Sequence, residues 1–188
     1  MKSKQTLKKY IAFLRGINVG GHHKVPMAEL RKELEAMSFQ NVTTLLNSGN
    51  VIFEAQPSED TELSERIAER LEKVFQFPVP TIVISADSLL DLLNDDPFKD
   101  EILTKESRGY VSFLQNKPET SLKLPWISED SSLKILRAND KLICSHLDLT
   151  KAKTPEAMNV LEKFYGKQMT TRNWNTIQRI GAKVNTPN

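Results

Sequence analysis

The chain has 188 residues, of which 39% are hydrophobic and 27% are charged, and its formal net charge is +2. This length is enough to bury a sizeable core, and the regular scatter of apolar residues argues against a disordered chain. No apolar stretch is long enough to span a bilayer, so we expect a folded globular protein with no membrane partner.

Charge is unevenly distributed along the chain. Residues 1–28 carry six bases and no acid, residues 56–101 carry twelve acids against four bases, and residues 149–188 carry seven bases against two acids. If the two basic ends meet in space, they form a positive face that would attract phosphates or nucleic acid. The alternative is that both ends are solvated tails and helix faces.

The single cysteine and the first residues bear on the compartment. Cys144 lies in the alternating run 142–145, where a buried, inert thiol is expected, and no disulfide can form within the chain. Residues 1–9 lack the hydrophobic segment of a signal peptide, and we interpret them as a flexible Lys-rich tail. We therefore expect a cytoplasmic protein.

The first half of the chain alternates between strand and helix patterns. The elements expected are a strand (10–14), a helix (27–37), a hairpin (42–46 and 51–54), an amphipathic helix (63–75) and a strand (79–84). This order predicts a ferredoxin-like βαββαβ subdomain over residues 10–84, with four antiparallel strands and two helices on one face.

The second half, residues 85–188, is expected to form another small α+β subdomain packed on the first, which makes the fold class α+β. The elements expected are a helix capped at 85–87, strands at 110–114, 133–136 and 142–149, a short helix within 117–129, a helix at 155–165 ended by Gly166, and a last helix after residues 169–171.

The strongest candidate for a site is the glycine loop, residues 15–24, which follows the first strand. Glycines allow backbone N–H groups to approach a ligand, and Arg15 and Lys24 bracket them with positive charge. The glycine spacing matches neither the dinucleotide fingerprint nor the phosphate-binding loop. The layout therefore predicts a small-anion site without naming a reaction.

Topology brings a second segment to this loop. If the first crossover is right-handed and strands 10–14 and 42–46 are parallel, the end of strand 10–14 and the hairpin turn 47–50 lie at the same end of the sheet. The candidate ligand-binding residues of this half are Arg15, Gly16, Asn18, Gly20, Gly21, Lys24, Asn47, Ser48, Gly49 and Asn50. For Arg15, a buried ion pair with Glu54 or another acid is the alternative, and for Ser48 it is ordinary turn chemistry.

Residues 171–176 contribute a further candidate segment at the start of the last helix. Arg172, Asn173 and Asn175 are expected to close the site from the second subdomain, with Arg172 adding a bidentate anion contact. The alternative is a helix N-cap at Thr171 with Trp174 in the core, which leaves those three polar residues unexplained.

Metal and cofactor chemistry are not expected. His22 and His23 are adjacent and point apart in an extended loop, so they are poorly placed to chelate one metal, and no cofactor motif is present. Either histidine could act as an acid or base, but no nucleophile or carboxylate partner is visible. Whether the protein is an enzyme is therefore left open.

Two other functions compete with a small-anion site. The paired aromatics of an RNA-recognition strand are missing from residues 50–54, which disfavours stacked single-strand binding but leaves backbone contacts through the Lys-rich ends. The other alternative is a structural or partner-binding protein whose loop residues only satisfy turn geometry.

Three blocks of the sequence carry a resemblance to a known family. FLRGINVGGHHKVPMAEL, LNSGNVIF and TTRNWNT resemble the bacterial family named domain-of-unknown-function family 1697, and the resemblance extends from about Tyr10 to about Ala182. It implies a soluble bacterial α+β protein with two small sheet-and-helix subdomains. It implies no activity.

Overall fold

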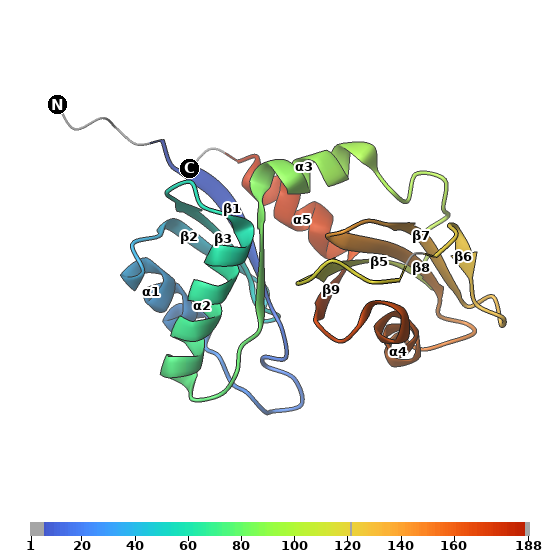
Figure 1. The fold of residues 1–188 in the computed structure, drawn as a ribbon, viewed down its shortest axis with the longest axis horizontal. Helices are drawn as coiled ribbons and strands as arrows, with labels where there is room; N and C mark the ends of the chain where they lie inside the picture. The colour runs from blue at the N-terminus through green and yellow to red at the C-terminus, as the bar shows by residue number, and fades with distance from the viewer. Residues whose placement is uncertain (1–5, 121, 187–188) are drawn as a thin grey trace. The chain divides into compact units, whose positions relative to one another are not determined.

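The structure, a computed structural model, describes residues 6–120 and 122–186. The chain forms two compact units (Figure 1). The first contains the residues up to 90 together with those from 180 onward, and the second contains residues 91–179. The last turns of the chain thus belong with the first unit, whereas the sequence had suggested that everything after residue 84 forms the second.

The first unit has the expected βαββαβ order. Its elements are β1 (Lys8–Leu14), α1 (Met27–Ala36), β2 (Gln40–Leu45), β3 (Asn50–Ala55), α2 (Asp60–Phe75) and β4 (Thr81–Ser85). The strands form a four-stranded sheet in the order β2-β3-β1-β4, and every neighbouring pair is antiparallel. The mixed fold class and the four-stranded antiparallel sheet predicted from the sequence are confirmed.

The two helices of this unit cover the same face of the sheet, as Figure 1 shows. Leu30 and Leu34 of α1 share one apolar core with Leu63 and Ile67 of α2 and with the sheet residue Phe53. These helix positions recur at the spacing that places them on one side of a helix. The amphipathic pattern in the sequence therefore predicted the buried faces correctly.

Strand β1 is the central element of the first unit. All five residues from Tyr10 to Leu14 are buried, because β3 and β4 pair with its two edges and both of its faces are covered. The sequence of a strand that is covered on both faces is continuously apolar, instead of alternating between apolar and polar residues. The run 10–14 in the sequence reflects this position.

The second unit is built on a five-stranded antiparallel sheet in the order β6-β7-β8-β5-β9. The remaining elements are α3 (Ala86–Asp95), β5 (Ser107–Leu114), β6 (Trp126–Ile127), β7 (Leu133–Ala138), β8 (Leu142–Asp148), α4 (Thr154–Tyr165), β9 (Met169–Asn173) and α5 (Trp174–Val184). Ala157 and Leu161 of α4 pack into the core on one face of this sheet. The helix predicted over 155–165 and its end at Gly166 are confirmed.

Two predictions for this half are wrong. The described residues between 117 and 129 contain the short strand β6 and no helix, because this segment pairs with β7. Residues 169–173 form strand β9, which pairs with β5, and the last helix begins only at Trp174. Its N-cap is Asn173, whose Oδ1 accepts the Thr176 N–H at 2.8 Å, instead of Thr171.

No helix in the described part of the chain is long and apolar enough to cross a membrane.

A buried serine ties α2 to the edge strand β4. Ser64 Oγ donates to the Asp60 carbonyl at 2.7 Å and accepts the Val83 N–H at 2.9 Å. The Val83 N–H lies on the edge of β4 away from β1, where a buried donor without a partner would be costly. This hydroxyl therefore supplies the acceptor for one buried donor on the sheet edge.

We expect Ser64→Ala to lower the free energy of unfolding by about 1–2 kcal/mol, because the Val83 N–H loses its acceptor inside the protein. Urea denaturation measures the change. Ser88→Ala, at an exposed position in the first turn of α3, is the matched control and should stay within about 0.5 kcal/mol of wild type. Equal effects of the two substitutions would contradict the role assigned to Ser64.

Candidate functional site

The end of β1 and the turn between β2 and β3 meet at one end of the first sheet. Phe13 pairs with Asn50 in the sheet register, and the Leu14 N–H donates to the Gly49 carbonyl at 2.8 Å. The glycine loop, residues 15–24, begins directly after this contact. The structure thus brings together the loop and the turn that were expected to share a site.

Gly49 makes this close approach possible. A Cβ at this position would lie 2.7 Å from Leu14 Cβ and 2.8 Å from Ile17 Cδ1, and its φ of +74° favours glycine. A side chain at residue 49 would push the turn away from β1. Gly49 therefore has a structural role, and its own atoms are packed against the loop.

Asn18 holds the glycine loop closed. Its Oδ1 accepts the Val25 N–H at 2.9 Å, and its Nδ2 donates to the Val25 carbonyl at 3.0 Å and to the Asn47 carbonyl at 2.9 Å. Both amide hydrogens are therefore used within the fold. The sequence suggested Asn18 as a ligand contact, whereas its position makes it a clamp between the loop and the turn.

Asn50 has a similar role inside the turn. Its side chain is fully buried, and its Nδ2 donates to the Leu45 carbonyl at 2.9 Å and to Ser48 Oγ at 3.0 Å. These bonds fix the turn from within. Asn50 is thus placed to support the turn instead of facing a ligand.

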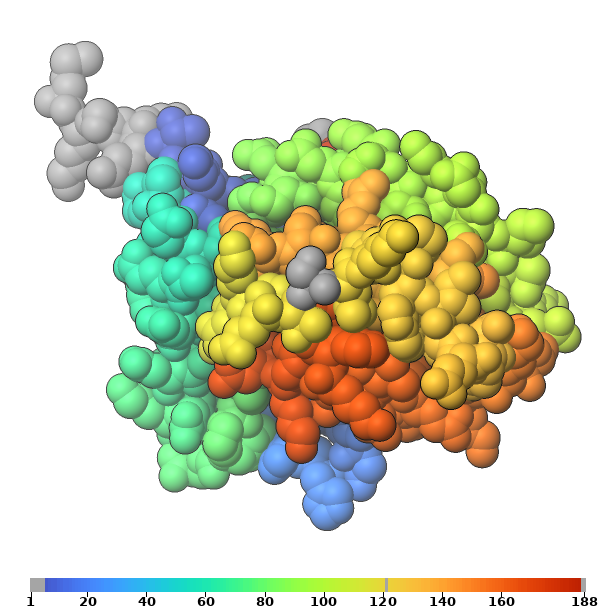
Figure 2. Space-filling model, turned by 45° about the vertical axis from the view of Figure 1, so that its right-hand side comes forward, coloured from blue at the N-terminus to red at the C-terminus, as the bar shows by residue number. Residues whose placement is uncertain are grey.

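The tip of the glycine loop is a small hairpin. Asn18 N–H donates to the His23 carbonyl and His22 N–H donates to the Val19 carbonyl, both at 3.1 Å. Gly20 and Gly21, between them, have φ values of +59° and +79°, as a two-residue primed turn requires. The blue atoms of this hairpin lie at the lower edge of the surface in Figure 2.

A third segment, residues 77–80, reaches the same end of the sheet. The Arg15 N–H donates to the Pro80 carbonyl at 2.9 Å, and the His23 ring stacks on Phe77 with 4.5 Å between the ring centroids. We name residues 15–24, 46–49 and 77–80 together the loop rim. The third segment was not expected from the sequence, although β4 had to start beside the end of β1 in the predicted topology.

The loop rim carries positive charge and no carboxylate. Arg15 is partly buried and Lys24 is exposed, and neither aspartate nor glutamate occurs among its residues. The alternative pair of Arg15 with Glu54 is wrong, because Glu54 lies opposite Lys9 at the other end of β1 and accepts a hydrogen bond from Asn41. The acids nearest in sequence are Glu29, Glu54 and Glu72, each five residues from a segment of the loop rim.

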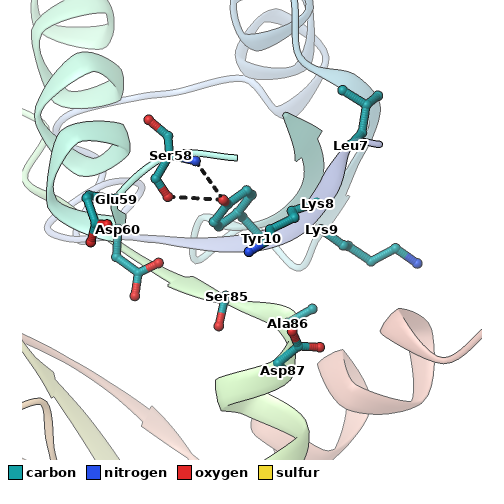
Figure 3. Close-up of a pocket in the computed structure, with 10 residues that line it drawn as sticks. All are labelled: Leu7, Lys8, Lys9, Tyr10, Ser58, Glu59, Asp60, Ser85, Ala86 and Asp87. Carbon is teal, nitrogen blue, oxygen red and sulfur yellow. Dashed lines mark hydrogen bonds between the residues drawn. The ribbon is translucent and has the colours of Figure 1, made fainter. Parts of the chain in front are cut away.

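An open cavity of about 440 Å³ lies at the opposite end of the same sheet (Figure 3). Tyr10 is part of its wall, and its hydroxyl donates to the Ser58 carbonyl and accepts the Ser58 N–H, both at 3.1 Å. Glu59, Asp60 and Asp87 also line it. The cavity is therefore surrounded by charges of both signs and is poorly suited to a polyanion.

The two basic ends of the chain meet near this cavity. Lys9 Nζ donates to the Val184 carbonyl at 2.9 Å, at the C-terminal end of α5. A cation at this position stabilises the negative end of the helix dipole. In Figure 3 the Lys9 side chain extends away from Glu59 and Asp60. This lysine thus has a structural partner.

The candidates of the second unit lie on and just after β9. The Arg172 guanidinium donates to Thr170 Oγ1 at 3.0 Å and to the Thr171 carbonyl at 2.9 Å, and burial lowers its pKa to about 10. Asn173 and Asn175, together with Arg108, line a cavity of about 80 Å³ at the start of α5. Their predicted convergence with the glycine loop stays a prediction.

The buried Cys144 and the partly buried His146, both on β8, have structural surroundings. Burial raises the pKa of the Cys144 thiol to about 12, so it is an inert thiol at neutral pH, as predicted. The Glu101 carboxylate accepts from Lys134 Nζ at 2.5 Å and lies 3.2 Å from His146 Nδ1, which ties the segment before β5 to β7 and β8. The described residues contain no cluster of three or more potential metal ligands from histidine, cysteine and acidic side chains.

The comparisons with known proteins agree with this architecture. The family model described as "Protein of unknown function (DUF1697)" matches residues 7–140. The chain belongs to this family. No curated protein matches this DUF1697 chain.

A solved structure has the same fold. The conserved bacterial protein SP0830 from Streptococcus pneumoniae superposes with a TM-score of 0.67 at 24% sequence identity, over 95% of this chain and 99% of that chain. At this identity, the likeness extends to the fold alone. The fold of this DUF1697 chain is thus shared with an independently solved protein.

We expect Gly49→Ala to destabilise the first unit by about 3 kcal/mol or more, because the added Cβ meets Leu14 and Ile17 at a left-handed φ. Gly21→Ala is the matched control: its φ is also positive, but nothing lies within 4 Å of the added Cβ. Gly21→Ala should lower the free energy of unfolding by only about 1 kcal/mol. Equal losses in urea denaturation would show that backbone conformation alone explains Gly49.

Proposed function

We propose that this DUF1697 protein binds a small anionic ligand, a phosphate or another oxyanion, at the loop rim. The observation that carries the proposal is the convergence of three segments without a carboxylate around Arg15 and Lys24. Cations gathered on one surface attract oxyanions, and an arginine fork matches the geometry of an oxyanion. The proposal concerns binding and assigns no reaction.

The exposed backbone of the glycine loop supports the same proposal. Nothing lies within 4 Å of the Cβ positions of Gly16, Gly20 and Gly21, so a ligand can come close to the main chain there. The clamps made by Asn18 and Asn50 hold the loop and the turn in one geometry before a ligand arrives. Such preorganisation lowers the entropic cost of binding.

Nucleic-acid binding through the Lys-rich ends is the rival proposal. The contact between Lys9 and α5 favours it, because it brings the two basic ends together. The carboxylates of Glu59, Asp60 and Asp87 beside that contact argue against nucleic-acid binding there. The inert, buried Cys144 fits a reducing compartment such as the cytoplasm for either function.

Lys24→Ala and Lys8→Ala separate these proposals, because both lysines are exposed but Lys8 begins β1, whereas Lys24 ends the glycine loop that follows β1. At fixed ionic strength, calorimetry with phosphate should show about tenfold weaker binding for Lys24→Ala and no change for Lys8→Ala. Both variants should unfold within about 0.5 kcal/mol of wild type, since exposed lysines contribute little to stability.

Binding of labelled single-stranded RNA to the same two variants completes the test. If Lys8→Ala weakens salt-sensitive RNA binding while phosphate binds neither variant nor wild type, the nucleic-acid proposal replaces the small-anion proposal. Equal loss of phosphate binding in both variants would also contradict a site at the loop rim, because only one lysine belongs to it.

A further inference from the structure

The His23 side chain is held in place although it is exposed. Its ring stacks on Phe77 at an interplanar angle of 21°, and its Nδ1 lies 3.2 Å from the Gly16 carbonyl oxygen. Its backbone adopts a left-handed φ of +50°, which is uncommon for residues other than glycine. An exposed ring fixed on one face and at one edge is oriented in advance for a ligand.

The contact with Gly16 determines which ring nitrogen titrates. A carbonyl oxygen can only accept a hydrogen bond, so Nδ1 carries a hydrogen both in neutral His23 and in its protonated form. Nε2 is therefore the nitrogen that gains a proton on acidification. The bond to Gly16 persists through that change, so the ring keeps its orientation while its charge changes.

The surroundings of His23 are compatible with a bound anion. The charged or titratable groups of its own loop are Arg15, His22 and Lys24, and none of them is acidic. On the side of Phe77, the last turn of α2 carries Glu72 and Lys73. A protonated ring stacked on Phe77 also gains a favourable interaction between cation and aromatic face.

We propose that His23 is a pH-dependent ligand of the oxyanion at the loop rim. When Nε2 is protonated, it donates a charge-assisted hydrogen bond to a doubly charged oxyanion, and it loses this donor when the pH rises. This inference rests on the proposed function and adds a regulation to it: the anion is captured at mildly acidic pH and released at alkaline pH.

Sulfate is the appropriate probe, because its charge stays constant where histidine titrates, whereas phosphate itself changes charge. Calorimetry at fixed ionic strength should show sulfate binding to wild type tightening about tenfold from about pH 8 to about pH 5.5. His23→Phe keeps a ring on Phe77 but has no nitrogen, so its sulfate affinity should not vary with pH. His22→Gln, the control at the neighbouring histidine, should keep the wild-type dependence.

A pH-independent affinity in wild type, a dependence that persists in His23→Phe, or one that is lost in His22→Gln would each overturn the role of His23. These outcomes leave the anion site intact. If sulfate and phosphate bind wild type at neither pH, the proposed function itself fails.

A measurement on the wild-type protein avoids any effect of the substitutions on folding. In histidine-selective NMR titrations, added sulfate should move the titration midpoint of His23 to higher pH and leave that of His22 in place, because linkage is reciprocal. A neutral His23 that carries its hydrogen on Nε2 would contradict the tautomer on which the inference depends.

Discussion

The loop rim depends on one backbone contact, the approach of the end of β1 to the β2–β3 turn at Gly49. The hydrogen bond from Leu14 to Gly49 is possible only because residue 49 has no side chain. It joins segments that are about 35 residues apart in the sequence, where closing a flexible loop costs entropy. The buried core beneath, made by α1, α2 and the sheet, compensates for that cost.

The polar residues of the loop rim divide into two groups. The amides of Asn18 and Asn50 donate to backbone carbonyls and fix the shape of the loop and of the turn. The side chains of Lys24 and His23 are exposed instead. A site in which one set of groups holds the geometry can present the other set to a ligand with little rearrangement.

Topology was the part of this arrangement that sequence reasoning predicted well. The apolar run 10–14 and the two amphipathic helices fixed the order and the faces of the first unit, and that order placed the glycine loop beside the turn. The roles of Asn18 and Asn50 could not be predicted in the same way. Apart from Ser48 Oγ, their partners are main-chain groups, which carry no sequence signal.

Errors in the second unit have a related cause. Residues 169–173 form a strand because β5 offers an edge to pair with, and the threonines at 170 and 171 were the local signal for it. Because Trp174, Ile177 and Ile180 recur at helical spacing, the predicted helix was started too early, among residues that belong to the strand. Tertiary pairing decided the boundary, and this moved Arg172 from a helix start to a partly buried strand position.

The most direct test of an anion site at the loop rim is a backbone amide NMR titration of the ¹⁵N-labelled protein with sulfate at constant ionic strength. We predict saturable shifts that are largest at Gly16, Gly20, Gly21 and Lys24, because these amides lie where the ligand is expected. Shifts that grow linearly without saturation, or that centre on the cavity beside Tyr10 and Asp87, would contradict the account.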